Sequence, residues 1–385
     1  MRLNAGGREA LLSYATNVHP AETLAEVWEA LRTHAVPLKA AASPDGPLGV
    51  GLYLSAAAAE PLAARPESAE GFREFLAAAG LEVVTLNAFP FETFHARRVK
   101  ETVYRPDWTT PRRLAYTLAA GRALAALLPE GGTGTVSTLP GSWKAWEADE
   151  ERMAANLLEA AEGFRRIGEE TGRTLILCLE PEPLCTLETT EETVAFFRRH
   201  LSGVRRHLGV CLDTGHLAVE FEDLRASVRR FRAEGIRVAK VQMSSALAVR
   251  EPGRNPGAVR RLMDFDEERF LHQVTARTPA GILRLADLGL LADAPPAWRD
   301  ASEWRCHFHV PVDREAFPPL QTTQGELAAV LPDLLALPER PHFEVETYTW
   351  GVLPEAERPT DRDGLVQGLA RELAWARAAL TGRLF

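Results

Sequence analysis

Short apolar runs alternate with longer amphipathic stretches from one end of the chain to the other. Eight of the short runs have the length and apolar character of β-strands, so each predicts a strand. The predicted strands are Leu12–Val18, Leu48–Leu54, Glu82–Ala88, Thr133–Thr138, Thr174–Leu179, Leu208–Leu212, Val238–Met243 and His342–Glu346.

The longer stretches carry apolar residues at helical spacing and are rich in Ala, Leu, Glu and Arg, which favour helices. Two of them are followed by Gly80 and Gly172, where a left-handed residue commonly ends a helix. We interpret the Ala- and Pro-rich segment Ala56–Pro66 as a surface connection. The predicted helices are Glu22–Thr33, Ala69–Ala79, Arg112–Leu128, Glu150–Thr171, Glu191–His200, Glu222–Glu234 and Asp363–Leu380.

The order of these elements predicts the fold class. Repeated strand–helix alternation is typical of parallel βα units, and eight such units close into a barrel. A doubly wound open sheet would need a glycine-rich turn after its first strand, whereas here that strand runs into Asn17-Val-His-Pro. The pattern therefore predicts an α/β protein, a single (β/α)8 TIM barrel formed by residues 1–385.

Two connections are longer than a barrel requires. Residues 246–312 follow the seventh predicted strand and contain a helical pattern at Glu267–Ala276, a Pro-rich segment and the strand-like Cys306-His-Phe-His-Val-Pro-Val. Loops of this length are uncommon unless they are functional, so we interpret this region as an insertion that covers the carboxyl-terminal face of the barrel. Residues 89–111, after the third strand, form a second elaboration.

Composition narrows the classes of function. The chain has 385 residues, of which 46% are hydrophobic and 25% charged, and its formal net charge is −9. This acidity and the lack of a basic run argue against a nucleic-acid partner. No apolar run predicts a membrane span, and the first residues lack a secretory pattern. The four cysteines show no disulfide spacing, so we expect a cytoplasmic protein, for which a homodimer is left open.

Polar residues stand where four successive predicted strands end. They are Glu180, Asp213 with His216 just beyond it, Gln242 and Glu346. Because strand ends meet at one face of a barrel, three carboxylates would crowd together, and buried carboxylates are costly unless they are paired or bind a metal. We therefore predict one divalent metal ion, Mn²⁺ or Mg²⁺ in preference to Zn²⁺ or Co²⁺, because the donors are mainly oxygens. The alternative is that these residues cap strands or pair with arginines.

Other polar residues near strand ends are candidates for contact with a small-molecule metabolite. Asn17 and His19 lie at the end of the first predicted strand, Asn87 lies in the third, and Lys240 lies in the seventh. Each could bind a hydroxyl or phosphate group. Asn87 could instead stabilise its own turn, and His19 could cap the following helical region.

The motifs at the strand ends also carry a resemblance. Leu-Glu-Pro-Glu-Pro at residues 179–183, Leu-Asp-Thr-Gly-His at 212–216 and Val-Glu-Thr at 345–347 resemble the xylose isomerase-like, or AP endonuclease 2-like, TIM-barrel superfamily of sugar isomerases and epimerases. Over nearly the whole chain the sequence is more closely similar to EboE-type metabolite traffic proteins of bacterial ebo operons. The motifs for that narrower resemblance are Ser13-Tyr-Ala-Thr-Asn-Val-His-Pro, Asn87-Ala-Phe-Pro-Phe, Tyr104-Arg-Pro-Asp-Trp, Phe308-His-Val-Pro and Glu344-Val-Glu-Thr-Tyr-Thr-Trp.

The resemblance implies roles for particular residues. Glu180, Asp213 and Glu346 would be metal ligands, and Glu180 and Glu346 would also exchange the proton of the substrate carbon. His216 would contact the substrate. The sequence departs from the superfamily at Gln242, where a histidine ligand is usual. Either Gln242 ligates the metal, or His309 of the insertion takes that place; a His-x-His segment such as His307–His309 is equally typical of ordinary packing.

These residues lead us to expect a metal-dependent isomerase or epimerase that acts on a small polyhydroxylated carbonyl compound through an enediolate. The alternative is a non-catalytic or accessory protein that binds a metabolite, as the resemblance to EboE-type proteins implies. An apurinic endonuclease is disfavoured, because it would need several more histidines and a basic face that this acidic chain lacks.

Overall fold

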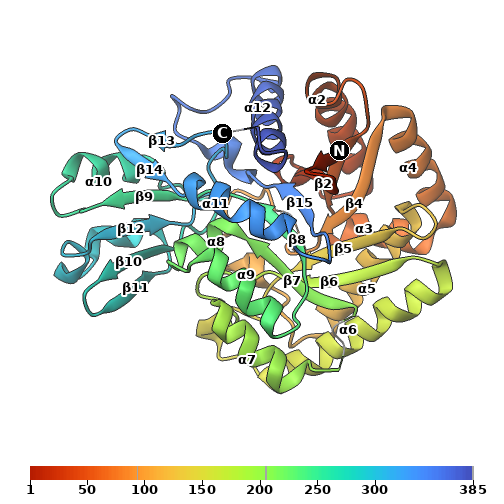
Figure 1. Ribbon diagram of the computed structural model, residues 1–385, viewed down its shortest axis with the longest axis horizontal. Helices are drawn as coiled ribbons and strands as arrows, with labels where there is room; N and C mark the ends of the chain where they lie inside the picture. The colour runs from red at the N-terminus through yellow and green to blue at the C-terminus, as the bar shows by residue number, and fades with distance from the viewer. Residues whose placement is uncertain (93, 204–205, 384–385) are drawn as a thin grey trace.

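The computed structural model describes residues 1–92, 94–203 and 206–383. Eight parallel strands close into a barrel, because the first of them pairs with both the second and the last (Figure 1). These strands are β2 (Arg8–Ala15), β3 (Leu48–Tyr53), β4 (Leu81–Asn87), β5 (Thr133–Thr138), β6 (Thr174–Leu179), β7 (Leu208–Asp213), β8 (Val238–Met243) and β15 (His342–Val345). A short strand, β1 (Arg2–Ala5), pairs antiparallel with β2. The predicted TIM barrel is confirmed.

Helices surround the barrel, and most follow the predicted pattern. Gly80 and Gly172 end two of them in the left-handed conformation, with φ of 66° and 69°. These helices are α1 (Leu24–Ala30), α2 (Val36–Ala42), α3 (Ala56–Ala64), α4 (Pro66–Ala79), α5 (Pro111–Leu127), α6 (Glu150–Thr171), α7 (Thr190–His200), α8 (Thr214–Val219), α9 (Leu224–Ala233), α11 (Gln324–Leu335) and α12 (Arg362–Leu380). Within the described ranges no helix is both long enough and apolar enough to cross a bilayer.

The helices around the barrel differ from the prediction at three places. The segment predicted as a surface connection is helix α3, because Ser55 caps it and its buried alanines and Leu62 pack against the core. The first helix does not end at Thr33 but continues through a wide π turn, Leu31–Ala35, into α2. Helix α11 was missed, although Leu327, Leu331 and Leu334 are buried on one side of it.

The insertion after β8 folds into a second sheet, which lies to one side of the barrel in Figure 1. The sheet has six antiparallel strands and is accompanied by helix α10 (Pro256–Met263). Its strands are β9 (Leu247–Arg250), β10 (Val274–Thr278), β11 (Gly281–Leu285), β12 (Glu303–Cys306), β13 (Ala316–Phe317) and β14 (Leu320–Thr322). The sheet therefore extends ten residues beyond the predicted end of the insertion at 312.

The helix predicted at Glu267–Ala276 does not form. Its last residues belong to β10, which pairs with β11 on one side and β12 on the other. Pairing on both edges stabilises an extended backbone more than the local helical pattern stabilises a helix, since intrinsic propensity is a weak determinant.

Residues 307–312, which we call the strap, connect the second sheet to the carboxyl-terminal face of the barrel. Strand β12 ends at Cys306, so the strap lies outside the sheet. Backbone hydrogen bonds hold it in place, from His307 N to Gln273 O at 2.8 Å and from Val310 N to Ser245 O at 2.9 Å. Both strap histidines are buried.

The barrel interior contains an ion pair that water does not reach. Lys240 of β8 lies 2.8 Å from a carboxylate oxygen of Glu344 on the adjacent strand β15, and neither side chain is exposed. Gly51 of β3 makes room for this pair, because a Cβ at that position would lie 1.3 Å from Glu344 Oε2. A residue without a side chain is therefore required opposite the pair.

We expect Gly51→Ala to destabilise the protein by about 2–4 kcal/mol, because the added methyl group pushes the Glu344 carboxylate away from Lys240 and leaves a buried charge poorly paired. Urea unfolding measures this difference. Gly325→Ala is the matched control, since Gly325 lies in the first turn of α11 with no atom near its added Cβ, and alanine there should be neutral or stabilising. Equal effects of the two substitutions would contradict the packing argument.

Candidate metal centre

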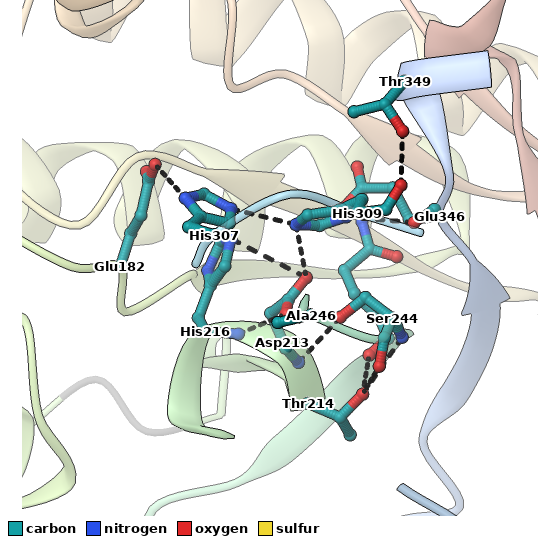
Figure 2. Close-up of polar contacts among 12 residues, drawn as sticks. Glu182, Asp213, Thr214, His216, Ser244, Ala246, His307, His309, Glu346 and Thr349 are labelled. Carbon is teal, nitrogen blue, oxygen red and sulfur yellow. Dashed lines mark hydrogen bonds and ion pairs between the residues drawn. The ribbon is translucent and has the colours of Figure 1, made fainter. Parts of the chain in front are cut away.

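Three carboxylates converge at the carboxyl-terminal face of the barrel. Glu180 directly follows β6, Asp213 is the last residue of β7, and Glu346 directly follows β15. All three are buried. Asp213 can offer a ligand atom within 4.8 Å of atoms from Glu180 and His216, and also within 4.8 Å of atoms from His309 and Glu346. Asp213 thus links two overlapping groups of potential ligands (Figure 2).

Hydrogen bonds orient these carboxylates and leave some of their oxygens free. Asp213 Oδ1 accepts from the His216 backbone N–H at 2.8 Å, which caps helix α8, and from Ser244 Oγ at 2.6 Å. Glu346 Oε1 accepts from Asn17 Nδ2 at 2.8 Å and from Asn87 Nδ2 at 3.0 Å. In contrast, Asp213 Oδ2 and Glu180 Oε2 are buried without a hydrogen-bond partner. Free, buried carboxylate oxygens at one place fit a divalent cation.

Imidazoles from the strap and from α8 complete the group. His309 Nε2 and His216 Nε2 each lie 3.9 Å from Asp213 Oδ2. His307 Nε2 lies 3.0 Å from His309 Nε2. Figure 2 shows the strap passing above Asp213 with both of its histidines directed toward the carboxylates.

Burial and mutual repulsion shift the pKa values of these groups. Burial, with a contribution from Asp213, raises the pKa of Glu180 to about 7 against the opposing effect of His216. Burial and the charges of Glu180 and Asp213 raise the pKa of Glu346 well above its ordinary value. Burial also lowers the pKa of His309 to about 4. A bound divalent cation would reverse the effect on the carboxylates, because it favours their ionised form.

The other predicted site residues fall into two groups. Asn87 and Asn17 line the cavity beside Glu346, whereas His19 and Lys240 do not line it. His19 stacks on His34 with ring centroids 4.2 Å apart, so it packs on the outer side of the first strand end. Lys240 lies deeper in the barrel, paired with Glu344.

Gln242 lies beside Asp213 in the register of β7 and β8. Its side chain is completely buried, and neither its amide oxygen nor its amide nitrogen has a hydrogen-bond partner. An unpartnered amide on the strand beside Asp213, whose Oδ2 is also unpartnered, would fit a ligand that contacts both residues.

A network on the outer side of the cavity was not predicted as part of the site. Tyr104 donates a hydrogen bond from its hydroxyl group to Glu182 Oε1 at 2.7 Å, and Gln273 Nε2 lies 3.0 Å from that hydroxyl oxygen. Glu182 and Tyr104 both lie in the quoted motifs, so a signal for them was present. Gln273 precedes β10, far along the sequence, and no pattern pointed to it. Phe89, Phe94, Phe270 and Tyr348 provide apolar walls.

Comparisons with known proteins agree with this architecture. The family model described as "Xylose isomerase-like TIM barrel" matches residues 47–287. A D-psicose 3-epimerase structure determined in the presence of D-fructose is similar over 97% of this chain and 100% of its own, with a TM-score of 0.50 and 13% identity. An L-ribulose 3-epimerase gives the same TM-score and identity over 97% of this chain and 96% of its own.

A D-allulose 3-epimerase from Methylomonas sp. is similar over 96% of this chain and 98% of its own, with a TM-score of 0.50 and 14% identity. At such identities the three structures show a shared fold only. No curated protein sequence matches the chain significantly.

If the carboxylates share one cation, Glu180→Gln and Asp213→Asn should each reduce bound Mn²⁺ well below one equivalent. The gain in Tm on adding Mn²⁺ should also shrink, because a ligand at 100 times its Kd stabilises a protein by about 2.7 kcal/mol. Metal analysis and thermal unfolding measure both effects. Glu220→Gln is the matched control, since Glu220 is a buried carboxylate paired with Arg284 outside the site. Unchanged metal content in both site variants would rule out the shared cation.

Mn²⁺ affinity of the unaltered protein should rise from about pH 6 to about pH 8. The affinity should increase with pH because Glu180 has a pKa of about 7 in the metal-free protein, so its carboxyl group must lose a proton before it can bind a cation. Isothermal titration at several pH values measures the change. An affinity that is flat over this interval would contradict the participation of Glu180.

Proposed function

The chain belongs to the xylose isomerase-like TIM barrel family, and on this premise we propose that it is a metal-dependent isomerase or epimerase of a small sugar or sugar-like carbonyl compound. The observation that carries the proposal is the pair Glu180 and Glu346. Both are buried carboxylates that line one cavity from different strands and adjoin Asp213. Two such groups could act on one carbon from two sides.

The proposed cation is held by Glu180, Asp213 and Glu346. Gln242 is the fourth ligand that we favour, because its buried amide oxygen lacks a partner and it neighbours Asp213 on the next strand; His309 is the alternative. Mn²⁺ or Mg²⁺ suits this oxygen-rich set, and Zn²⁺ or Co²⁺ would also fit. When bound, such a cation supplies the Lewis acidity that makes a hydrogen next to a carbonyl group easier to remove.

The protein's own groups would handle the proton. One glutamate takes it from the substrate carbon, and the other returns a proton on the opposite side. Burial raises the pKa of Glu180 to about 7 without a metal, and a bound cation would lower it, so that the carboxylate is ionised as a base must be. Asn17 and Asn87 bind Glu346 Oε1 and so keep the other oxygen, Oε2, oriented. The aromatic walls would exclude water from the reacting carbon.

A second candidate function is non-catalytic binding of a metabolite, in keeping with the resemblance to EboE-type proteins. Gln242 favours it, because a neutral amide is a weaker ligand than the histidine usual in this superfamily. Binding needs the cavity and its polar groups but no proton transfer, so the two functions differ in a measurable way.

The test is hydrogen exchange. We expect the Mn²⁺-loaded protein to exchange one carbon-bound hydrogen of at least one ketose or ketose phosphate in D₂O, as detected by NMR. Glu346→Gln should abolish the exchange, at least a hundredfold loss, because it removes one of the two proton-transfer groups. Glu220→Gln should leave it unchanged. A broad panel in which one compound binds and none exchanges would favour the non-catalytic function.

The fourth ligand has its own test. Gln242→Ala should weaken Mn²⁺ binding about tenfold or more, a loss of ~1.4 kcal/mol, and more than His309→Ala does. Isothermal titration with Mn²⁺ ranks the two variants. The reverse ranking would show that the strap, and not β8, completes the coordination of this ion.

A further inference from the structure

The two strap histidines approach each other more closely than neutral imidazoles should without a proton between them. His307 Nε2 and His309 Nε2 are 3.0 Å apart, and both side chains are buried. Whether this contact is a hydrogen bond depends on where each ring carries its proton. The partners of the Nδ1 atoms answer that question for all three histidines at the cavity.

For His309 and His216, the hydrogen-bond partner of Nδ1 shows directly where the ring carries its proton. His309 Nδ1 lies 3.0 Å from the backbone carbonyl oxygen of Glu346, and His216 Nδ1 lies 2.9 Å from that of Pro181. A carbonyl oxygen can only accept, so each Nδ1 carries the proton of the neutral ring. The Nε2 atom of each ring is then an unprotonated lone pair.

The position of the proton on the His307 ring follows from the hydrogen bonds of Gln273. The amide nitrogen of Gln273 lies 3.2 Å from the Pro183 carbonyl oxygen and 3.4 Å from Glu182 Oε1, and both of these oxygens accept. The amide oxygen of Gln273 therefore faces His307 Nδ1, at 2.7 Å. His307 Nδ1 must donate to it, which leaves His307 Nε2 as a lone pair as well.

Three Nε2 lone pairs thus point into one space, where His216, His307 and His309 can each offer a ligand atom within 4.8 Å of the others. Asp213 Oδ2 has no hydrogen-bond partner and lies 3.9 Å from two of these nitrogens. Lone pairs that face each other repel unless a cation lies between them. We propose that His216, His307 and His309 bind a second cation of the Zn²⁺ class, and that Asp213 bridges it to the ion held by Glu180 and Glu346.

The donor set and the spacing suit such an ion. Imidazole is a preferred ligand of Zn²⁺ and related transition metals, whereas Mn²⁺ and Mg²⁺ prefer oxygen. Zinc–nitrogen bonds are about 2.0–2.1 Å long, so two nitrogens roughly 3.0 Å apart can be adjacent ligands of one ion. His307 and His309 therefore need no large movement relative to each other to bind it.

The local charge also favours two ions. Glu180, Glu182 and Glu346 line the cavity and Asp213 adjoins them, while the nearby lysines are already paired, Lys100 with Asp287 and Lys240 with Glu344. One divalent cation would balance half of four carboxylates, and two would balance all of them. This inference goes beyond the proposed reaction and holds whether or not the protein is catalytic.

The experiment counts ions. The full-length protein is stripped with chelator, reloaded with Zn²⁺, dialysed and analysed for metal; we expect two equivalents. His307→Gln and His309→Gln should each bind one. His342→Gln, the matched control, should keep two, since this buried histidine begins β15 at the other end of the barrel. Crystals of the unaltered protein should show two anomalous peaks at the zinc edge, which tests the site without any variant.

Glu180→Gln separates this inference from the proposed function. It should lose the ion at the strand ends and retain the one held by histidines, so it too should bind one equivalent. If the unaltered protein binds one ion and Glu180→Gln removes it, the second site is overturned and the proposed function still stands. A proton shared by His307 and His309 would then explain their short contact. Two equivalents in both His307→Gln and His309→Gln would also overturn it.

Discussion

Repulsion among buried carboxylates is the constraint on which the arrangement of this protein depends. Glu180, Asp213 and Glu346 meet where water is largely excluded, so each raises the energy of ionising the others. Hydrogen bonds from Asn17, Asn87 and Ser244 offset part of this cost on one oxygen of Glu346 and one of Asp213. The remaining oxygens face a common space, and a cation is the most effective way to stabilise them.

The same constraint acts one layer deeper in the barrel, with a different solution. There Glu344 lies against Lys240, and Gly51 provides the space that the pair occupies. Because Lys240 is paired with Glu344, it does not neutralise the carboxylates at the rim of the barrel. The ion pair in the barrel interior and the cation that we propose at its rim would therefore be complementary, and the two layers share strands β8 and β15.

Helix α12 (Figure 1) anchors two segments that border the site, the strap and the residues after β15. Glu372 of this helix is buried and accepts hydrogen bonds from Val312 N at 3.0 Å, Thr347 Oγ1 at 2.6 Å and Trp350 Nε1 at 2.8 Å. It therefore connects the end of the strap to the segment after β15. Burial raises the pKa of Glu372 to about 7, against the effect of these donors. Thr349 adds a hydrogen bond to the carbonyl oxygen of His309, so the strap and Glu346 are held as one unit.

The sequence by itself determined the barrel and the meeting of Glu180, Asp213 and Glu346. Burial on both faces makes parallel strands read as short apolar runs, and closure of the barrel brings all their carboxyl ends to one face. Tertiary structure decided the rest. Alternation along β8 places Lys240 on the same face as Gln242. It does not predict how far Lys240 lies below the rim of the barrel, or that Lys240 forms an ion pair with Glu344. The local pattern before β10 favours a helix, yet pairing with β11 and β12 makes a strand. The places of His307, His309 and Gln273 depend on that sheet, because contacts between residues far apart in sequence, such as His307 N to Gln273 O, fix the strap over the strand ends.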